Sequence, residues 1–491
     1  MTPSPRRTCL AALAALAVAS GAGAQELDRS KIPAPGMTPA VEAPAVQKQT
    51  LSNGLELWTV SRHELPVINA VLVIRAGAAQ DGAQPGLADV TAGLLDEGSG
   101  ERSALEFTRA YERYGIQLTT SVEADRTTVT LQSLSATADS AFAFLGELVS
   151  KPAFSVEEIE RDRKSRLTAL AARKDQPVVV ATRVFERAVY GADHAYGHPV
   201  DGTIESITAL TRDDITAFYQ RYYRAGNALL IVVGDVSPTQ AAELAGPAFA
   251  RWQHGETTAA TPATPAPTAP PLKARTVLLV DKPGAAQSEI RIGHTGAARS
   301  TDPDYYALQV MNAVLGGQFY SRINLNIREK QGYTYGARSA WSYRRGPGPF
   351  MASAGVVTAK TDSALVEFFR ELEDIAGARP ATPEEVEFAK GAIVRAYPRR
   401  IETNQGVANE LADLAFFGLP ASEIADYQQK IAAVTPADVN RVAARYVQPD
   451  HFITVVVGDL AKIRPGIEAL NLGEVTVVGP EGGPVEPPTG E

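Results

Sequence analysis

Apolar and polar positions follow two patterns along this chain, and the same order of patterns occurs twice. Short runs rich in β-branched residues, typical of strands, open each half at 55–60 and 67–74 and again at 275–280 and 288–294. Segments with apolar residues at helical spacing follow them. Hairpin-like strands followed by clustered helices favour the α+β class, with an antiparallel sheet in each half and helices packed mainly on one face.

A matching unit near the end of each half indicates an internal duplication. In the first half, a helix capped by Thr211 leads to a β-branched strand that closes with Gly-Asp at 234–235. In the second half, Thr435 caps the equivalent helix and Gly-Asp at 458–459 closes the equivalent strand. A chance repeat of one helix-strand unit is the alternative. The shared order of cap, helix, strand and Gly-Asp favours two homologous domains.

The first 24 residues have the three parts of a cleavable export signal. Arg6 and Arg7 supply positive charge, an Ala/Leu-rich run begins at Leu10, and Ala22 and Ala24 form an Ala-x-Ala cleavage site. The arginine pair leaves a twin-arginine signal open as an alternative. We therefore expect a periplasmic or secreted protein.

Composition divides the 491 residues into segments. The predicted segments are a signal peptide at 1–24, an N-terminal extension at 25–46, a first domain at 47–250, a Thr/Ala/Pro-rich linker at 251–272, a second domain at 273–462 and a C-terminal tail at 463–491. We expect the two domains to be separate folding units, because the linker composition cannot bury enough apolar area to order itself.

The overall composition excludes several classes of function. Hydrophobic residues make up 45% of the chain and charged residues 21%, with a net charge of -9, which argues against a nucleic-acid surface. After the signal, no apolar run approaches the roughly 20 residues of a membrane span, so we expect none in the mature chain. The single cysteine, Cys9, lies inside the signal, which excludes disulfide and thiol chemistry in the mature protein.

Seven phrases carry a resemblance to a peptidase family. They are Leu-Ser-Asn-Gly-Leu at 51–55, Arg-Ala-Gly-Ala at 75–78, Gly-Leu-Ala at 86–88, Glu-Ile-Glu-Arg-Asp at 158–162, Tyr-Gly-His-Pro at 196–199, Leu-Gly-Gly at 315–317 and Ile-Arg-Glu-Lys-Gln-Gly-Tyr-Thr-Tyr at 327–335. In these phrases the chain resembles the inverzincin zinc peptidases: pitrilysin, insulin-degrading enzyme, the mitochondrial processing peptidase and shorter bacterial relatives. The resemblance extends to about residue 462 and implies two domains that form half of a clamshell.

Active members of that family carry His-x-x-Glu-His on a helix after the Gly-Leu-Ala phrase. Two imidazoles four residues apart reach one Zn²⁺, the Glu activates water, and a distant Glu completes the ligands. The resemblance places Asp89, Ala92, Gly93 and Ala169 at these four positions. Ala and Gly can neither bind a metal nor move a proton, so the implied zinc site is degenerate and this chain holds no cofactor. We interpret Asp89 as a solvated polar residue of the helix.

Another possible metal group is Asp193 with His194 and His198. Gly197 and Pro199 predict a loop at this point rather than a helix, and the phrase resembles a structural loop of the family. We therefore interpret these histidines as structural.

In the family, the second domain contributes an Arg and a Tyr seven residues apart, which bind the substrate backbone and the oxygen that becomes negative during hydrolysis. Arg328 and Tyr335 match this pair. A guanidinium supplies fixed charge and several donors, and a phenol supplies a neutral directional donor. The alternative is a surface Arg and a half-buried strand Tyr.

The resemblance therefore implies a non-catalytic subunit of a periplasmic heteromeric zinc metallopeptidase, inactive alone. In the implied heterodimer, a zinc-bearing paralogous subunit holds the metal, and this chain donates Arg328 and Tyr335 and part of the chamber for peptide substrates. A peptide-binding or structural scaffold without proteolysis is the alternative. A self-sufficient peptidase with an unorthodox site is disfavoured, because the sequence contains no intact ligand cluster.

Overall fold

The computed structural model describes residues 36–252, 268, 274–299 and 303–485. Two compact units are distinguished, Met1–Pro39 and Ala40–Glu491. In the first unit only residues 36–39 are described, and they form no helix or strand. The predicted signal peptide lies outside the described residues, as does most of the predicted linker. All elements given below belong to the second unit.

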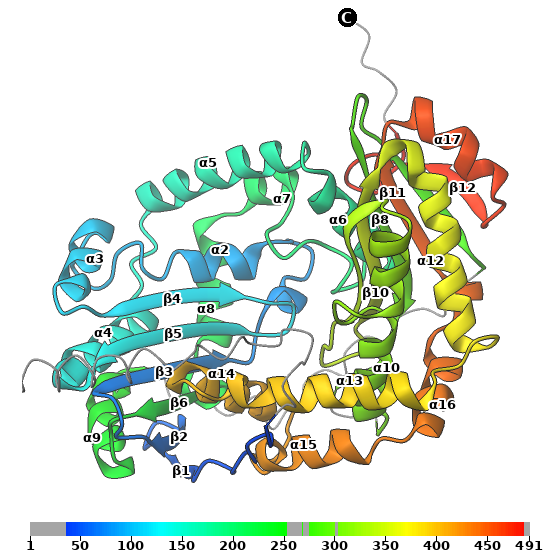
Figure 1. The fold of residues 1–491 in the computed structure, drawn as a ribbon. Coiled ribbons are helices and arrows are strands. Elements are labelled where there is room, and N and C mark those ends of the chain that lie inside the picture. The colour runs from blue at the N-terminus through cyan, green and yellow to red at the C-terminus, as the bar shows by residue number, and fades with distance from the viewer. Residues whose placement is uncertain (1–35, 253–267, 269–273, 300–302, 486–491) are drawn as a thin grey trace, which may run out of the picture. The chain divides into compact units, whose positions relative to one another are not determined.

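The first domain contains a six-stranded sheet in the order β1-β2-β6-β3-β5-β4 (Figure 1). Its strands are β1 (Gln47–Thr50), β2 (Glu56–Ser61), β3 (Val67–Ile74), β4 (Gln117–Val122), β5 (Thr127–Leu134) and β6 (Ala228–Gly234). Strand β6 pairs in parallel with β2 and antiparallel with β3. The other neighbouring pairs are antiparallel.

The second domain contains a sheet in the order β12-β7-β11-β8-β10-β9. Its strands are β7 (Thr276–Asp281), β8 (Gln287–Thr295), β9 (Thr334–Trp341), β10 (Pro349–Val357), β11 (Ile453–Gly458) and β12 (Glu474–Val477). Strand β11 pairs in parallel with β7 and antiparallel with β8, as β6 does with β2 and β3. Apart from the outermost strands β1 and β12, the two orders are the same, as expected for a duplicated domain.

The α+β class with two similar domains is confirmed, but both sheets are mixed and not purely antiparallel. The sheets are mixed because the strand that follows the helices in each domain inserts between two strands from the start of that domain. After several helices, β6 inserts between β2 and β3, and β11 inserts between β7 and β8. The apolar runs in the sequence identify neighbours along the chain and do not reveal such an insertion.

Helices of the first domain pack on one face of its sheet, apart from α6 (Figure 1). They are α2 (Leu87–Gly93), α3 (Ala104–Glu112), α4 (Ala138–Ser150), α5 (Val156–Arg173), α6 (Pro177–Tyr190), α7 (Ile204–Ala209), α8 (Arg212–Tyr222) and α9 (Pro238–Phe249). Ser103, Thr203, Thr211 and Ser237 begin four of them as capping boxes, accepting backbone N–H bonds at the helix starts.

The second domain repeats this arrangement, apart from α14. Its helices are α10 (Tyr305–Leu315), α11 (Arg322–Asn324), η5 (Leu325–Lys330), α12 (Thr361–Ala376), α13 (Pro383–Ala396), α14 (Asn404–Phe416), α15 (Glu423–Ala433), α16 (Pro436–Tyr446) and α17 (Leu460–Ala469). The predicted domain end at 462 lies inside α17, and β12 pairs with β7. Within the described parts of the chain, no helix is long and apolar enough to cross a membrane.

Each sheet is covered on its other face by a helix of the opposite domain (Figure 1). Helix α14 packs on the first sheet and α6 on the second. The buried contacts include Val407, Leu411 and Leu414 against Trp58, Val71 and Ile231, and Val180, Val184 and Phe185 against Val280, Val455 and Val457. Burying one such side chain stabilises a fold by roughly 1.5 to 3 kcal/mol. Each domain therefore has a core of its own and a second sheet face that is covered by a helix of the other domain.

Candidate functional site

The helix that follows the Gly-Leu-Ala phrase is α2, and its start depends on Gly86 and Asp81. Gly86 has a φ of +92°, and a Cβ there would lie 2.8 Å from the Cα of Gly202. The Asp81 carboxylate accepts hydrogen bonds from the backbone N–H groups of Gly86 (2.7 Å) and Ala88 (2.8 Å). Burial raises the pKa of Asp81 to about 7, although these two hydrogen bonds oppose the shift.

Asp89, at the first predicted metal position, is bound to Arg166 of α5. The guanidinium contacts the Asp89 carboxylate through Nη1 and donates from Nη2 to the Asp89 backbone oxygen (3.1 Å). Its Nε lies 2.6 Å from Asp162 Oδ2. Burial opposes the charge, but Asp89 and Asp162 outweigh it and raise the pKa of Arg166. The interpretation of Asp89 as a solvated residue is therefore wrong, because Arg166 uses both its carboxylate and its backbone oxygen.

The other three predicted positions supply no metal ligand. Ala92 is buried in α2, and Ala169 is exposed on α5. A Cβ on Gly93 would lie 2.5 Å from Arg166 Nη2, so the guanidinium fills the space beside Gly93. A divalent cation here would meet a fixed positive charge and one carboxylate that is already paired. The donor set does not fit zinc.

The predicted loop with two histidines follows α6 and precedes α7. The His194 ring stacks on Tyr190 with centroids 5.1 Å apart, and its Nδ1 accepts a hydrogen bond from the backbone N–H of Tyr196 (3.0 Å). Burial lowers the pKa of His198. Among the residues that the structure describes, no group of three or more His, Cys, Asp or Glu could hold a metal ion.

Arg328 and Tyr335 line one groove of about 540 Å³ in the second domain. Arg328 lies in η5 and Tyr335 in β9, and Gly332, with a φ of +67°, lies in the turn between them. The Arg328 guanidinium lies over the Phe319 ring at 4.7 Å, and its nearest carboxylate is that of the adjacent Glu329 at 3.3 Å. Tyr335 is 90% exposed and not the half-buried strand residue of the alternative interpretation. Both side chains have donors available to a ligand.

Three arginines at these places, Arg166, Arg291 and Arg338, are not among the residues predicted from the sequence. For Arg166 there was a signal, because Asp162 and Arg166 are four residues apart on one helix face. Arg291 of β8 and Arg338 of β9 both lie opposite Ser353 of β10, so all three share one sheet face, and they line the groove of Arg328 and Tyr335. The sequence contains no signal for this row, because it depends on the register of three strands.

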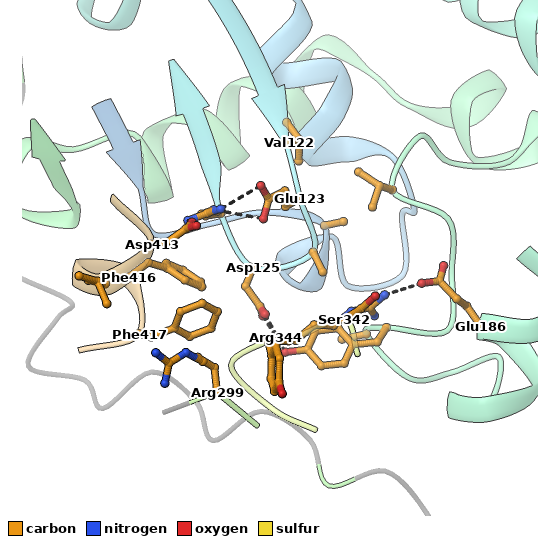
Figure 2. A pocket seen from close by; sticks show the side chains of 18 of the residues that line it. Val122, Glu123, Asp125, Glu186, Arg299, Ser342, Arg344, Asp413, Phe416 and Phe417 are labelled. Atoms are coloured by element: carbon orange, nitrogen blue, oxygen red, sulfur yellow. Dashed lines mark hydrogen bonds and ion pairs between the residues drawn. The ribbon is translucent and has the colours of Figure 1, made fainter. Parts of the chain in front are cut away.

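A second cavity, of about 530 Å³, is lined by segments of both domains (Figure 2). The turn between β4 and β5 and the loop after α6 form one side, and the end of α14 and the turn between β9 and β10 form the other. The Asp125 carboxylate joins these sides. It accepts hydrogen bonds from the Tyr196 hydroxyl (2.8 Å) and from the backbone N–H of Arg345 (3.0 Å). The segments that line this cavity are far apart in the sequence, so no sequence pattern predicts the cavity.

Comparison with known proteins gives two family matches. Residues 58–199 match insulinase (peptidase family M16), and residues 209–393 match the peptidase M16 inactive domain. An uncharacterized zinc protease of Streptomyces coelicolor is 27% identical over 407 residues, covering 81% of this chain and 86% of the relative. A Helicobacter pylori protein named non-peptidase homolog YmxG is 22% identical and covers 82% of this chain and 91% of its own length.

Solved structures show the same fold. A peptidase M16 inactive domain from Pseudomonas fluorescens superimposes with a TM-score of 0.78 at 26% identity, covering 84% of this chain and 97% of that one. A protease from Helicobacter pylori superimposes with a TM-score of 0.77 at 22% identity, covering 84% of this chain and 99% of that one. The likeness extends over both domains.

Proposed function

Because the chain belongs to the insulinase family, peptidase family M16, we propose that it is the non-catalytic subunit of a heteromeric zinc peptidase. In this proposal it donates Arg328 and Tyr335 to the active site of a zinc-bearing paralogous subunit. Within the family the chain is an inactive-type homologue, because Ala92, Gly93 and Ala169 have no ligand atoms and Asp89 is paired with Arg166.

The single observation that carries the proposal is that Arg328 and Tyr335 have hydrogen-bond donors that the rest of the described fold does not use. Arg328 and Tyr335 present a guanidinium and a phenol in an open groove, with no partner beyond the neighbouring Glu329 and the Phe319 ring within the described part of the chain. Such donors suit the oxyanion of peptide hydrolysis. A scaffold has no chemical need of them, which favours a role in catalysis at a partner's metal.

Relatives support both halves of the proposed pair. The Helicobacter pylori relative is named a non-peptidase homolog, and the Streptomyces coelicolor relative is named a zinc protease. Both kinds of protein therefore have sequences that align with this chain over most of its length. The zinc in the proposed complex belongs to the partner, and the substrates are peptides.

The proposed location is the periplasm or the cell exterior. It rests on the export signal in the first 24 residues, where Arg6 and Arg7 precede the apolar run and Ala22 and Ala24 form the cleavage site. Mass spectrometry of the protein from its native source tests this, since cleavage should leave Gln25 as the first residue.

The test of function is purification from the native source followed by mutation. A chain with an intact His-x-x-Glu-His motif should copurify. In the reconstituted complex, Tyr335→Phe should slow peptide hydrolysis by about 10² to 10³, the usual cost of removing one oxyanion donor. Arg328→Ala should slow it at least as much. Assembly and partner zinc content should not change in either variant.

Tyr320→Phe is the matched control, because Tyr320 is an exposed tyrosine of the same domain that does not line the groove. It should leave the rate unchanged. If the Tyr335→Phe and Arg328→Ala complexes assemble normally and hydrolyse peptide at the parental rate, the donated-site proposal fails and the scaffold alternative is favoured.

A further inference from the structure

The cavity between the domains has the size of a ligand site. Its volume of about 530 Å³ falls within the roughly 300 to 1,000 Å³ usual for small-molecule pockets. It is separate from the groove of Arg328 and Tyr335, since the two share no lining residue. An occupant would contact both domains at once.

The carboxylates that line this cavity all have partners of their own. Four of them pair with arginines: Glu123 (3.0 Å) and Asp413 (2.7 Å) with Arg126, Glu410 (2.8 Å) with Arg400, and Glu186 with Arg344. The fifth, Asp125, accepts hydrogen bonds from Tyr196 and Arg345. Because these carboxylates already have partners, they do not favour the binding of a cationic ligand.

Arg299 differs from the other lining arginines. Within residues 36–252, 268, 274–299 and 303–485 it forms no ion pair within 4 Å, although Glu410 and Glu423 act on its charge from farther away. Its guanidinium lies over the Tyr305 ring at 3.5 Å from the centroid. No carboxylate among the described residues therefore forms a direct ion pair with this guanidinium. A half-buried guanidinium in this state favours an anionic partner, and its fork of donors matches a carboxylate.

The surface beside Arg299 is apolar and aromatic. Leu414, Phe416 and Phe417, at the end of α14, line the cavity together with Tyr305. Figure 2 shows Phe416 and Phe417 among the lining side chains. Aromatic rings supply large apolar contact area to a ligand. Among the described residues, the cavity therefore offers a guanidinium without a direct ion pair next to an aromatic wall.

We propose that this cavity binds a carboxylate carried on an apolar group. Arg299 holds the carboxylate, and Phe416 and Phe417 contact the apolar part. Two sources have this chemistry: the C-terminus of a short peptide with an apolar last residue, and a free aromatic or aliphatic acid. The site goes beyond the proposed peptidase role and does not depend on it.

Calorimetric titration of the mature chain tests the proposal with three probes: acetyl-alanyl-phenylalanine, its C-terminal amide, and 3-phenylpropanoate. The peptide acid should bind at least about tenfold more tightly than its amide, because the amide loses a charge-assisted hydrogen bond. Arg299→Gln should remove this preference and leave amide binding unchanged. Arg299→Lys, which keeps the charge, should retain part of it.

Arg113→Gln is the matched control, because Arg113 is exposed on the first domain and away from the cavity. It should bind all probes like the parent, and the unfolding temperatures of the three variants should agree. Tighter binding of the peptide acid than of 3-phenylpropanoate identifies a peptide C-terminus as the ligand. Equal binding of the two acids identifies free acids. The proposal is overturned if acid and amide bind alike, if neither acid binds, or if Arg299→Gln binds like the parent.

Discussion

Two regions of the chain correspond to the two parts of the family's active site. The first is the contact between α2 and α5, and the second is the groove of Arg328 and Tyr335. They differ in whether the charged side chains have partners within the chain. At the first place, Arg166 lies between Asp89 and Asp162, and each of these side chains is less than a third exposed. At the second place, Tyr335 is 90% exposed, and among the described residues Arg328 contacts the Phe319 ring and pairs with no carboxylate except that of the adjacent Glu329.

This difference indicates that the charged side chains between α2 and α5 stabilise the fold, whereas Arg328 and Tyr335 are available for a functional role. Between α2 and α5, a guanidinium of the chain itself neutralises two carboxylates, and this contact joins the two helices. Within the described part of the chain, Arg328 and Tyr335 have no comparable internal partner for their donors, so these two side chains stabilise the fold little. Mutations at the two places should therefore have opposite effects on stability and on activity.

The largest effect on stability is expected for Arg166→Ala. It leaves Asp89 and Asp162 close together without a cation, and breaking a buried pair in this way costs about 3 to 5 kcal/mol. Partial exposure reduces the cost here to roughly 3 kcal/mol. Chemical denaturation of the parent and variant measures it.

Arg464→Ala is the matched control for this variant. Arg464 pairs with Glu468 at the same four-residue spacing on a helix (2.6 Å), but its side chain is 50% exposed. Its loss should change the unfolding free energy by less than about 0.5 kcal/mol. Equal effects of the two variants would mean that the pair at α2 and α5 is an ordinary surface contact.

The sequence predicts much of the fold and only part of this comparison. Periodicity and the Gly-Asp repeat indicate two similar α+β domains, because these signals are local. The exchange of α6 and α14 was not predicted, because an apolar helix face does not say which sheet it covers. The resemblance places Asp89 at a metal-ligand position of a degenerate site, but its pairing with Arg166 depends on how α5 crosses α2. The row of Arg291 and Arg338 depends on strand register.

Rebuilding the metal site should show whether Arg166 blocks it. The parent chain should bind no stoichiometric zinc by elemental analysis. In a variant with Asp89→His, Ala92→Glu, Gly93→His and Ala169→Glu, zinc should bind about 10 to 100 times more weakly when Arg166 is kept than when Arg166→Ala is added. That range is typical for a disturbed second shell of ligands. Competition with a chelating dye measures both affinities, and equal affinities would contradict a blocking role for the guanidinium.

The buried carboxyl group at the start of α2 should make stability depend on pH. Burial raises the pKa of Asp81 to about 7, whereas an unfolded aspartate has a pKa of about 3.9. Between these values the folded state binds more protons, so this group lowers the unfolding free energy as pH rises, by at most about 1.4 kcal/mol per pH unit. Asp81→Asn should flatten the dependence between pH 5 and 6, as measured by denaturation at both values. An unchanged slope would show that Asp81 is ionised throughout this range.

The smallest effect on stability is expected for Tyr335→Phe, and it gives the sharpest test of the comparison. Tyr335 is almost fully exposed, so loss of its hydroxyl should change the unfolding free energy by no more than about 0.5 kcal/mol. Tyr196→Phe removes a hydroxyl that donates to the Asp125 carboxylate (2.8 Å), and should cost about 1.5 to 3 kcal/mol. Thermal and chemical denaturation of both variants provides the measurement. If Tyr335→Phe is as destabilising as Tyr196→Phe, the Tyr335 hydroxyl belongs to the fold, and its presence in the groove no longer argues for a role in a partner's active site.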